Sequence, residues 1–241
     1  MSRVTSIEEL SNLKSKIETE RKFTKQVLIC GGTGCISSGS NEIADKMTEK
    51  VKAAGKENEI RVIKTGCFGF CEKGPIVKML PDNTFYTEVT PEDADRLVET
   101  HLLKEEKIEE LLFVDPVTKN KISDSDYMDF YKKQERVALR NCGVIDPENI
   151  EDYLLHDGYT ALDKVLKMSQ QEVVDIMKDS GLRGRGGGGF PTGLKWQFAL
   201  NNKSDQKYVV CNADEGDPGA FMDRSILEGD PHSVVEAMAI C

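Results

Sequence analysis

Four of the seven cysteines form two close pairs, and each pair directly follows a short run that predicts a β-strand. The pairs are Cys30 with Cys35 and Cys67 with Cys71, and glycines fill the turns around both. Glycine lets a backbone bend sharply, so loops at strand ends can bring four thiolates to one point. A dithiol redox pair is disfavoured because neither pair has the two-residue gap of that motif.

A metal centre with four thiolate ligands is the chemistry that this pattern favours. Zinc and a two-iron cluster both use paired cysteines, so the spacing alone leaves both centres open. The plain alternative is a set of unrelated buried thiols, since cysteine often serves as a small core residue. We predict that Cys142 and Cys211 are core thiols of that plain kind.

The hydrophobic pattern around these pairs predicts a small α/β domain. Ser6 and Glu9 form a capping-box pattern at the first helix. The predicted helices span residues 6–22, 41–54 and 90–103, the single strands 26–29 and 59–64, and a hairpin 75–80 with 84–87. This order suits a central sheet that ends near residue 104.

The second half of the chain has weaker patterns. We predict a linker over residues 105–139, with a helical centre at 126–139, and two short helices between 150 and 180. A strand is predicted over 207–211 and a helix over 231–241. The three histidines are scattered, make no catalytic triad and are predicted to lie at the surface.

Charge and composition exclude several classes of partner. The formal net charge is −10, so a nucleic acid or an anionic membrane is disfavoured as the main partner, because both need a basic footprint. No run approaches the roughly 20 apolar residues of a membrane span. The charged N-terminal segment lacks the apolar core of a secretory signal. We therefore predict a cytoplasmic protein whose partners are proteins and small molecules.

A glycine-rich run from Leu182 to Trp196 is the most informative stretch of the second half. Its backbone can lie close to a phosphate or a flat ring, and its arginines and lysine supply positive charge. A flexible linker is the alternative, which the density of other motif residues disfavours. Gly184 to Gly189 also fits G-x-G-x-x-G, but a polar helix precedes it where a Rossmann domain needs a strand.

An acidic loop from Asn212 to Gly219 follows the predicted strand. Clustered carboxylates beside an amide can bind ribose hydroxyls, the edge of a flavin ring or a metal ion. The alternatives are a solvated acidic turn and a Ca²⁺ loop, although the spacing does not match an EF-hand.

The two cysteine pairs, C-x4-C and C-x3-C, in this order of elements resemble the thioredoxin-like [2Fe–2S] ferredoxin family over residues 1–104. This resemblance favours iron over zinc. It implies that one [2Fe–2S] cluster is bound by Cys30, Cys35, Cys67 and Cys71.

The glycine loop and the acidic loop resemble the NADH-binding flavoprotein subunit of respiratory complex I, the 51-kDa-type family, from near Arg140 onward. The fusion to a ferredoxin domain is similar to the beta subunits of NAD-dependent electron-bifurcating [FeFe]-hydrogenases and related formate dehydrogenases. The implied fold is α/β: a small thioredoxin-like α/β domain at 1–104, a linker at 105–139, and at 140–241 the beginning of an α/β domain that binds FMN and NADH.

The resemblance implies three groups of cofactor-binding residues and no catalytic acid or base. The FMN phosphate and ring edge would be held by Gly184, Arg185, Gly186 and Lys195. The other side of the flavin would be held by Asn212, Asp214 and Glu215. NAD(H) would be bound by Phe190, Phe198 and, where the family often has Glu, Asp217.

The implied activity is hydride exchange between NAD(H) and a flavin, with single electrons passing to iron–sulfur centres and other redox subunits as partners. The family pattern also has a later flavin loop and a [4Fe–4S] cysteine cluster, so we expect a truncated chain whose longer parent carries them. Two alternatives stay open. One is an electron-transfer ferredoxin module whose C-terminal part only docks a partner, and the other is a zinc-stabilised interaction domain.

Overall fold

The computed structural model describes residues 6–241, which form two compact units. The first unit contains the described residues up to His156 together with Glu215–Pro231, and the second contains Asp157–Asp214 and His232–Cys241. Residues 1–5, with which the predicted first domain begins, lie outside the described residues. The predicted division into three segments stays a prediction.

A four-stranded sheet forms the centre of the first unit, as predicted. Its strands are β1 (Lys25–Cys30), β2 (Ile60–Thr65), β3 (Val77–Leu80) and β4 (Thr84–Tyr86), in the order β2-β1-β3-β4. β1 pairs with β2 in parallel and with β3 antiparallel, and β3 and β4 form the predicted hairpin. The parallel register places Cys30 opposite Thr65, so both cysteine loops leave the sheet at the same edge.

The helices of this unit include the three that the sequence predicts. They are α1 (Ile7–Glu20), α2 (Thr33–Ser37), α3 (Ser40–Ala53), α4 (Ala94–Arg96, continued by a π-helix at Leu97–Leu102), α5 (Asp129–Lys132), α6 (Ile150–Leu155) and α10 (Met222–Gly229). The Ser6 hydroxyl accepts the Glu9 backbone N–H at 3.2 Å, which confirms the predicted cap of α1. The short helix α2, which carries Cys35, was not predicted.

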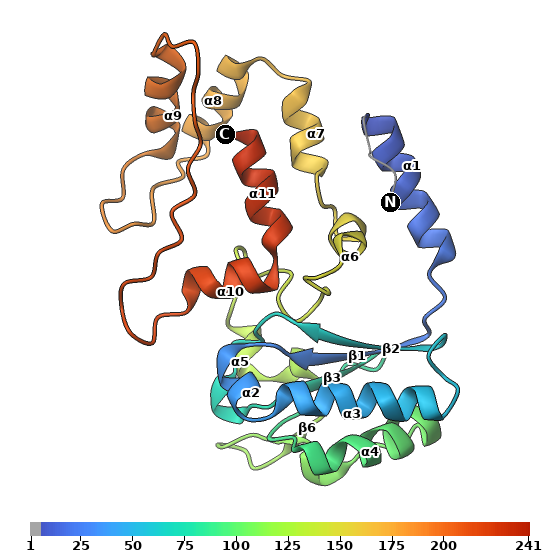
Figure 1. The fold of residues 1–241 in the computed structure, drawn as a ribbon. Coiled ribbons are helices and arrows are strands. Elements are labelled where there is room, and N and C mark those ends of the chain that lie inside the picture. The colour runs from blue at the N-terminus through green and yellow to red at the C-terminus, as the bar shows by residue number, and fades with distance from the viewer. Residues whose placement is uncertain (1–5) are drawn as a thin grey trace. The chain divides into compact units, whose positions relative to one another are not determined.

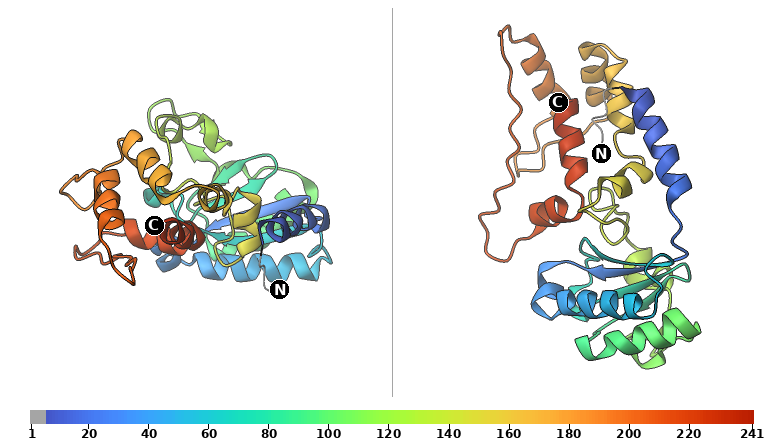
Figure 2. Two further views of the ribbon diagram at one scale, coloured as in Figure 1. Left: turned by 90° about the horizontal axis from the view of Figure 1, so that it is seen from above. Right: turned by 45° about the vertical axis from the view of Figure 1, so that its right-hand side comes forward.

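Each face of the sheet has its own core. Val27 and Ile29 pack with α3 and α4 on one face, where both helices are seen in Figures 1 and 2. Leu28 and Cys30 point to the other face, because successive side chains alternate along a strand. Residues of the predicted linker, including Met128, complete that second core. The linker also contains two short strands, β5 (Phe113–Val114) and β6 (Lys121–Ile122), which form a small separate sheet.

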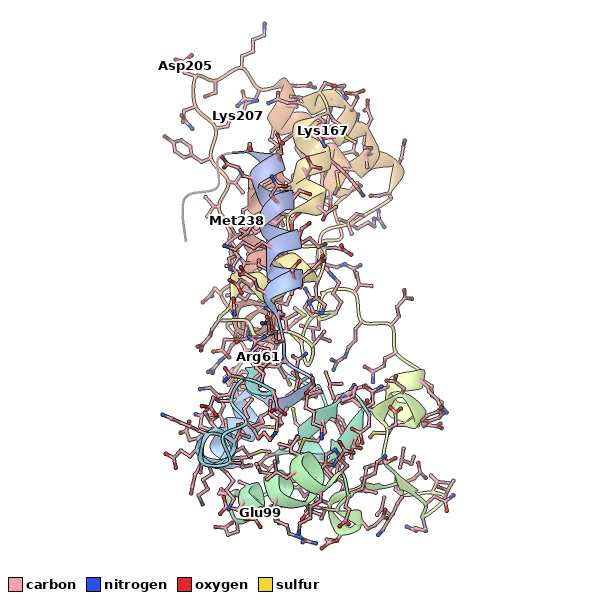
Figure 3. All side chains as sticks on the ribbon, turned by 90° about the vertical axis from the view of Figure 1, so that its right-hand side faces the viewer. Arg61, Glu99, Lys167, Asp205, Lys207 and Met238 are labelled. Carbon is pink, nitrogen blue, oxygen red and sulfur yellow. The ribbon has the colours of Figure 1, made fainter. Side chains whose placement is uncertain are left out.

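A buried ion network ties α6 and the end of α1 to the sheet. The Asp152 carboxylate, 4% exposed, accepts Arg61 Nη1 at 2.8 Å and also Arg21. Arg61, labelled in Figure 3, reaches Asp146 with its other nitrogen at 2.8 Å. Burial alone would raise the pKa of Asp152, but its arginine partners and the Asp146 backbone N–H hold that pKa below its ordinary value. Removing one partner of such a network leaves an uncompensated buried charge.

The second unit is helical. It contains α7 (Thr160–Leu166), α8 (Gln170–Asp179), α9 (Thr192–Asn201) and α11 (Pro231–Ile240), the last as predicted. The Glu236 carboxylate of α11 accepts the backbone N–H groups of Tyr159 and Leu162 at 2.7 and 3.0 Å, which joins α11 to the start of α7. A Cβ on Gly193 would lie 2.5 Å from the backbone nitrogen of Lys178, so only glycine lets α8 and α9 approach this closely.

Three predictions about local structure are wrong. Residues 207–211 form no strand, and Tyr208 and Val210 are 83% and 84% exposed. A strand needs a hydrogen-bonded neighbour, and no strand is described in this unit. The predicted helix at 126–139 stops at Lys132, since Arg136 turns to bind other loops. Residues 150–180 form three helices rather than two.

The prediction that all three histidines lie at the surface is wrong for His101, which is 8% exposed. Its Nδ1 pairs with the Tyr86 hydroxyl at 2.7 Å, and that oxygen also accepts the Ile108 backbone N–H at 3.0 Å. Asp82 lies 3.5 Å from the other ring nitrogen. The network joins β4 to the π-helix and to the segment that follows it.

Among residues 6–241, no helix is long and apolar enough to cross a bilayer.

Replacing Tyr86 by Phe should lower the free energy of unfolding of the first unit by about 1–3 kcal/mol, because His101 and the Ile108 N–H would lose a buried partner. Urea denaturation followed by circular dichroism measures the change. The matched control is Tyr127→Phe, since Tyr127 is 67% exposed, and it should leave the midpoint unchanged. Equal midpoints for the two variants would contradict a stabilising role of this hydroxyl.

Burial lowers the pKa of His101 below its ordinary value of 6.5, although Asp82 opposes that shift. The unfolded chain therefore binds this proton more readily, and the free energy of unfolding should fall as the pH drops below 6.5. Urea midpoints at about pH 7.5 and about pH 5.5 measure the dependence. His101→Gln should flatten it, whereas His156→Gln, at an exposed position, should not. The same pH dependence in both variants would rule out His101 as its source.

Candidate functional site

The four paired cysteines lie together at the edge of the sheet where β1 and β2 end. Cys30 is the last residue of β1 and Cys35 lies on α2, and both are almost fully buried. Cys67 follows β2 and is half-buried, and Cys71 begins a 3-10 turn and is exposed. The parallel pairing thus brings both predicted pairs to one place, as the sequence predicts.

The four thiols are connected by a series of hydrogen bonds. The sulfurs of Cys67 and Cys71 lie 4.0 Å apart, and Cys30 is hydrogen-bonded to both Cys35 and Cys67. Two thiolates on one tetrahedral metal at 2.3 Å would lie roughly 3.8 Å apart, so the observed spacing suits shared coordination. One face of the group is exposed through Cys71, and the other is closed by the core.

Backbone N–H groups point at these sulfurs. Gly69 donates to Cys67 Sγ at 3.3 Å, and the amides of Phe68 and Ile76 donate to Cys30 and Cys35. A Cβ on Gly32 would lie 2.9 Å from Cys67 Sγ, and one on Gly74 would lie 2.6 Å from Cys35 Sγ. The loops are therefore packed directly against the thiols, and side chains at these two glycines would fill the space that a cluster needs.

The pKa values of the thiols follow from the same contacts. The hydrogen bond between Cys30 and Cys35 raises the pKa of Cys30 to about 11. The hydrogen bond between Cys30 and Cys67 likewise raises the pKa of Cys67. Burial raises the pKa of Cys71, whereas the hydrogen bond with Cys30 lowers that of Cys35. Most of the group is thus protonated at neutral pH without metal, and metal binding would release protons.

The donor set of four thiols fits a two-iron cluster. A two-iron cluster needs only two thiolates on each iron, and N–H groups on the sulfurs are typical of its surroundings. A cavity of about 480 Å³ opens beside Cys67 and Cys71, bounded by both cysteine loops and by α10.

Sequence reasoning missed three residues beside the second cysteine loop. Arg136 and Tyr131 both donate to the Phe68 carbonyl, and Cys142 accepts the Cys67 backbone N–H. Cys142 is 2% exposed, which confirms its prediction as a core thiol, whereas the same prediction for Cys211 is wrong because Cys211 is exposed. No local pattern marks these contacts, since each joins residues more than 60 positions apart.

In the second unit, the predicted glycine loop connects α8 to α9. Gly184 N–H donates to the Phe190 carbonyl at 2.8 Å and Thr192 N–H to that of Leu182 at 2.9 Å, which closes the base of the loop. A polar helix precedes the loop, as the sequence predicts. Around Gly186, Gly187 and Gly188 an added Cβ would meet no atom within 4 Å, so the tip of the loop is open and its amides are accessible.

The predicted FMN and NAD(H) residues of this unit lie at the exposed loop and on α9. Arg185, Gly186 and Lys195 are exposed, and Lys195 lies in the first turns of α9. Phe190 and Phe198 face each other with ring centroids 6.3 Å apart. Glycine amides beside cationic side chains have the chemistry that a phosphate needs. The assignment of these residues to FMN and NAD(H) stays a prediction.

The predicted acidic loop passes from the second unit into the first. Asn212 Oδ1 accepts the Asp214 backbone N–H at 3.0 Å, so these two residues form a local turn. Burial opposes ionisation of Glu215, but the backbone N–H groups of Asp223 and Arg224, at 2.9 and 3.1 Å, lower its pKa below the ordinary value. Glu215 thereby caps α10. Asp217 is exposed, and the roles predicted for these carboxylates stay untested.

Two known families match separate parts of the chain. Residues 3–102 match the family described as thioredoxin-like [2Fe-2S] ferredoxin, and residues 177–241 match the Nuo51 FMN-binding domain.

Two curated relatives are similar in sequence to part of the chain. A stretch of 109 residues is 72% identical to the NADP-reducing hydrogenase subunit HndC of Solidesulfovibrio fructosivorans, covering 45% of this chain and 22% of that protein. A stretch of 107 residues is 49% identical to an NADH-quinone oxidoreductase subunit of Rhizobium meliloti (strain 1021), covering 44% and 25%. The chain therefore spans about a quarter of the length of these relatives.

Among solved structures, the thioredoxin-like [2Fe-2S] ferredoxin from Aquifex aeolicus is 31% identical, with a TM-score of 0.36, over 39% of this chain and 99% of that one. The family matches confirm both predicted resemblances. The chain thus joins a segment that matches the thioredoxin-like [2Fe-2S] ferredoxin family to one that matches the Nuo51 FMN-binding domain. It is related to subunits of NADH-quinone oxidoreductases and of NAD- and NADP-reducing hydrogenases.

Proposed function

We propose that this chain is part of an NADH-oxidising or NAD-reducing oxidoreductase subunit that uses FMN and iron–sulfur clusters. The observation that carries the proposal is the convergence of the four thiols at one edge of the sheet, in a chain whose second segment matches an FMN-binding family. A hydrogenase and a complex I-like assembly are the contexts that its relatives suggest, and a formate dehydrogenase is the third context that the sequence resemblance implies.

In the first unit, Cys30, Cys35, Cys67 and Cys71 would hold a [2Fe–2S] cluster. The amides that donate to these sulfurs would stabilise negative charge on the cluster and so set its reduction potential. Burial of Cys30 and Cys35 would exclude water from one side. The exposed side at Cys71 would be the side that exchanges electrons with a partner.

In the second unit, the open glycine loop would bind the FMN phosphate. The amides at Gly184 and Gly186 and the side chains of Arg185 and Lys195 would donate to phosphate oxygens. Asn212 and Asp214 of this unit would hold the flavin from its other side, and Phe190 and Phe198 would bind NAD(H). The same roles are proposed for Glu215 at the flavin and Asp217 at NAD(H), and both of these residues belong to the first unit. When bound, FMN supplies the exchange between two-electron and one-electron chemistry.

Other redox subunits are the proposed partners, because the named relatives are themselves subunits. A cytoplasmic location and a [4Fe–4S] cluster in a longer parent chain belong to the same proposal. No side chain of the chain is assigned as an acid or a base, since hydride transfer to a flavin needs none.

A second candidate is an electron-transfer ferredoxin module whose C-terminal part docks a partner. The observation in its favour is the exposure of large apolar side chains in the second unit, such as Leu166 at 67% and Phe198 at 62%. Side chains of this kind are available for contact with a partner. The first candidate predicts that the chain binds FMN, whereas the second predicts that it binds none.

Anaerobic reconstitution of the chain with iron, sulfide and FMN tests the proposal. We expect two irons and two sulfides per chain, visible absorption that bleaches on reduction, and bound FMN that NADH reduces. Cys67→Ser should lose the cluster, whereas Cys211→Ser, at an exposed cysteine of the second unit, should keep it. A cluster without flavin would favour the electron-transfer module, and a colourless chain with one zinc would refute the redox assignment.

Gly32→Ala should lose most of the reconstituted cluster, because the new methyl group would lie 2.9 Å from Cys67 Sγ and 3.5 Å from Cys30 Sγ. Gly34→Ala is the matched control, since a Cβ there meets nothing within 4 Å. Iron and sulfide per chain, with the urea midpoint of the metal-free protein, separate loss of the site from loss of the fold. Equal cluster content in the two variants would contradict a site at these thiols.

A further inference from the structure

One peptide group connects the second cysteine loop to the segment after α5. It is the peptide between Phe68 and Gly69, whose N–H donates to Cys67 Sγ at 3.3 Å. Its oxygen accepts two hydrogen bonds, one from the Tyr131 hydroxyl at 3.0 Å and one from the Arg136 guanidinium. Because the N–H and C=O of a peptide point in opposite directions, the cation and the sulfur lie on opposite sides of this group.

Arg136 is held in place by two further contacts and by the absence of a side chain at Gly69. Its Nη1 donates to the Cys142 carbonyl at 3.2 Å, and its guanidinium carbon lies 5.5 Å from the centre of the Tyr131 ring. Gly69 has a φ of +78°, and a Cβ there would lie 2.7 Å from Nη2, so a larger residue would displace the guanidinium. Among the ion pairs of the described residues, none involves Arg136. Its half-buried charge is therefore not neutralised by a carboxylate.

A cation on the oxygen of a peptide polarises that peptide and strengthens the hydrogen bond made by its N–H. Reduction of a thiolate-bound cluster adds one negative charge, which N–H donors on sulfur and nearby cations stabilise. Both effects act at Cys67, and both favour the reduced form. They should raise the reduction potential of a cluster bound there.

We propose that Arg136 is a positioning residue for the cluster: it fixes and polarises the Phe68–Gly69 peptide and thereby raises the reduction potential of the cluster at Cys67. The proposal rests on the [2Fe–2S] assignment made above and extends it to a residue of the predicted linker. Tyr131 acts on the same peptide oxygen as a second, neutral donor.

The test is an EPR-monitored redox titration of the full chain after anaerobic reconstitution, with iron and sulfide determined for each variant. Arg136→Gln should shift the midpoint potential to a more negative value, and Arg136→Lys, which keeps the charge but not the planar fork, should shift it less. Tyr131→Phe should produce a small shift in the same direction. The matched controls are Arg140→Gln, an exposed arginine of the same segment, and Tyr127→Phe, and both should leave the potential unchanged.

An unchanged potential in Arg136→Gln at full cluster content would overturn the proposal, and so would an equal shift in Arg140→Gln, which would indicate a general charge effect. If Arg136→Gln assembles no cluster, the proposal is tested with Arg136→Lys and Tyr131→Phe instead. Unchanged potentials in both of these variants would overturn it. Absence of iron and sulfide from the unaltered chain is a different result, because it refutes the cluster assignment itself.

Discussion

The parallel pairing of β1 with β2 is the constraint on which the thiol site depends. Parallel strands end at the same edge of a sheet, and this register places Cys30 opposite Thr65, two residues before Cys67. Thr65 then holds two other segments, the first cysteine loop and the loop at residues 143–145. Its carbonyl accepts Gly31 N–H at 2.8 Å, and its hydroxyl donates to Ile145 O at 2.7 Å and accepts Gly143 N–H at 3.1 Å. A shift of one residue in the register would separate the cysteine pairs and turn the core residues outward.

Local signals were sufficient for the elements that build this sheet. The cap at Ser6 and the short runs before the two cysteine pairs each depend on neighbours within a few residues, and the structure has the cap, β1 and β2. The prediction of a strand at 207–211 was wrong because it took no account of a pairing partner. A strand is stabilised by its partner rather than by its own residues, and Tyr208 and Val210 have none among the strands described.

The segment after Lys132 shows how tertiary contacts override helix propensity. Its run of Lys, Gln, Glu and Arg residues favours a helix, yet the chain leaves the helix so that Arg136 can reach the Phe68 carbonyl. Cys142 then packs closely against two glycines of the first unit, since Cβ atoms on Gly66 and Gly229 would lie 2.9 and 2.5 Å from its sulfur. These contacts could not be predicted, because no sequence pattern near Arg136 or Cys142 indicates which distant residue each one contacts.

The two predicted cofactor regions differ in how far they are organised. The thiols, their amide donors and the supporting peptide are already in contact, so little ordering free energy should oppose assembly of a cluster. The glycine loop has an open tip, and its fixation on a phosphate would cost about 1–2 kcal/mol for each residue ordered. Glu215–Pro231 falls inside the segment that matches the FMN-binding family, yet it packs with the first unit through Gly229. Glu215, which caps α10, can therefore contact a flavin only through carboxylate lone pairs that this cap leaves available, or by giving up the cap.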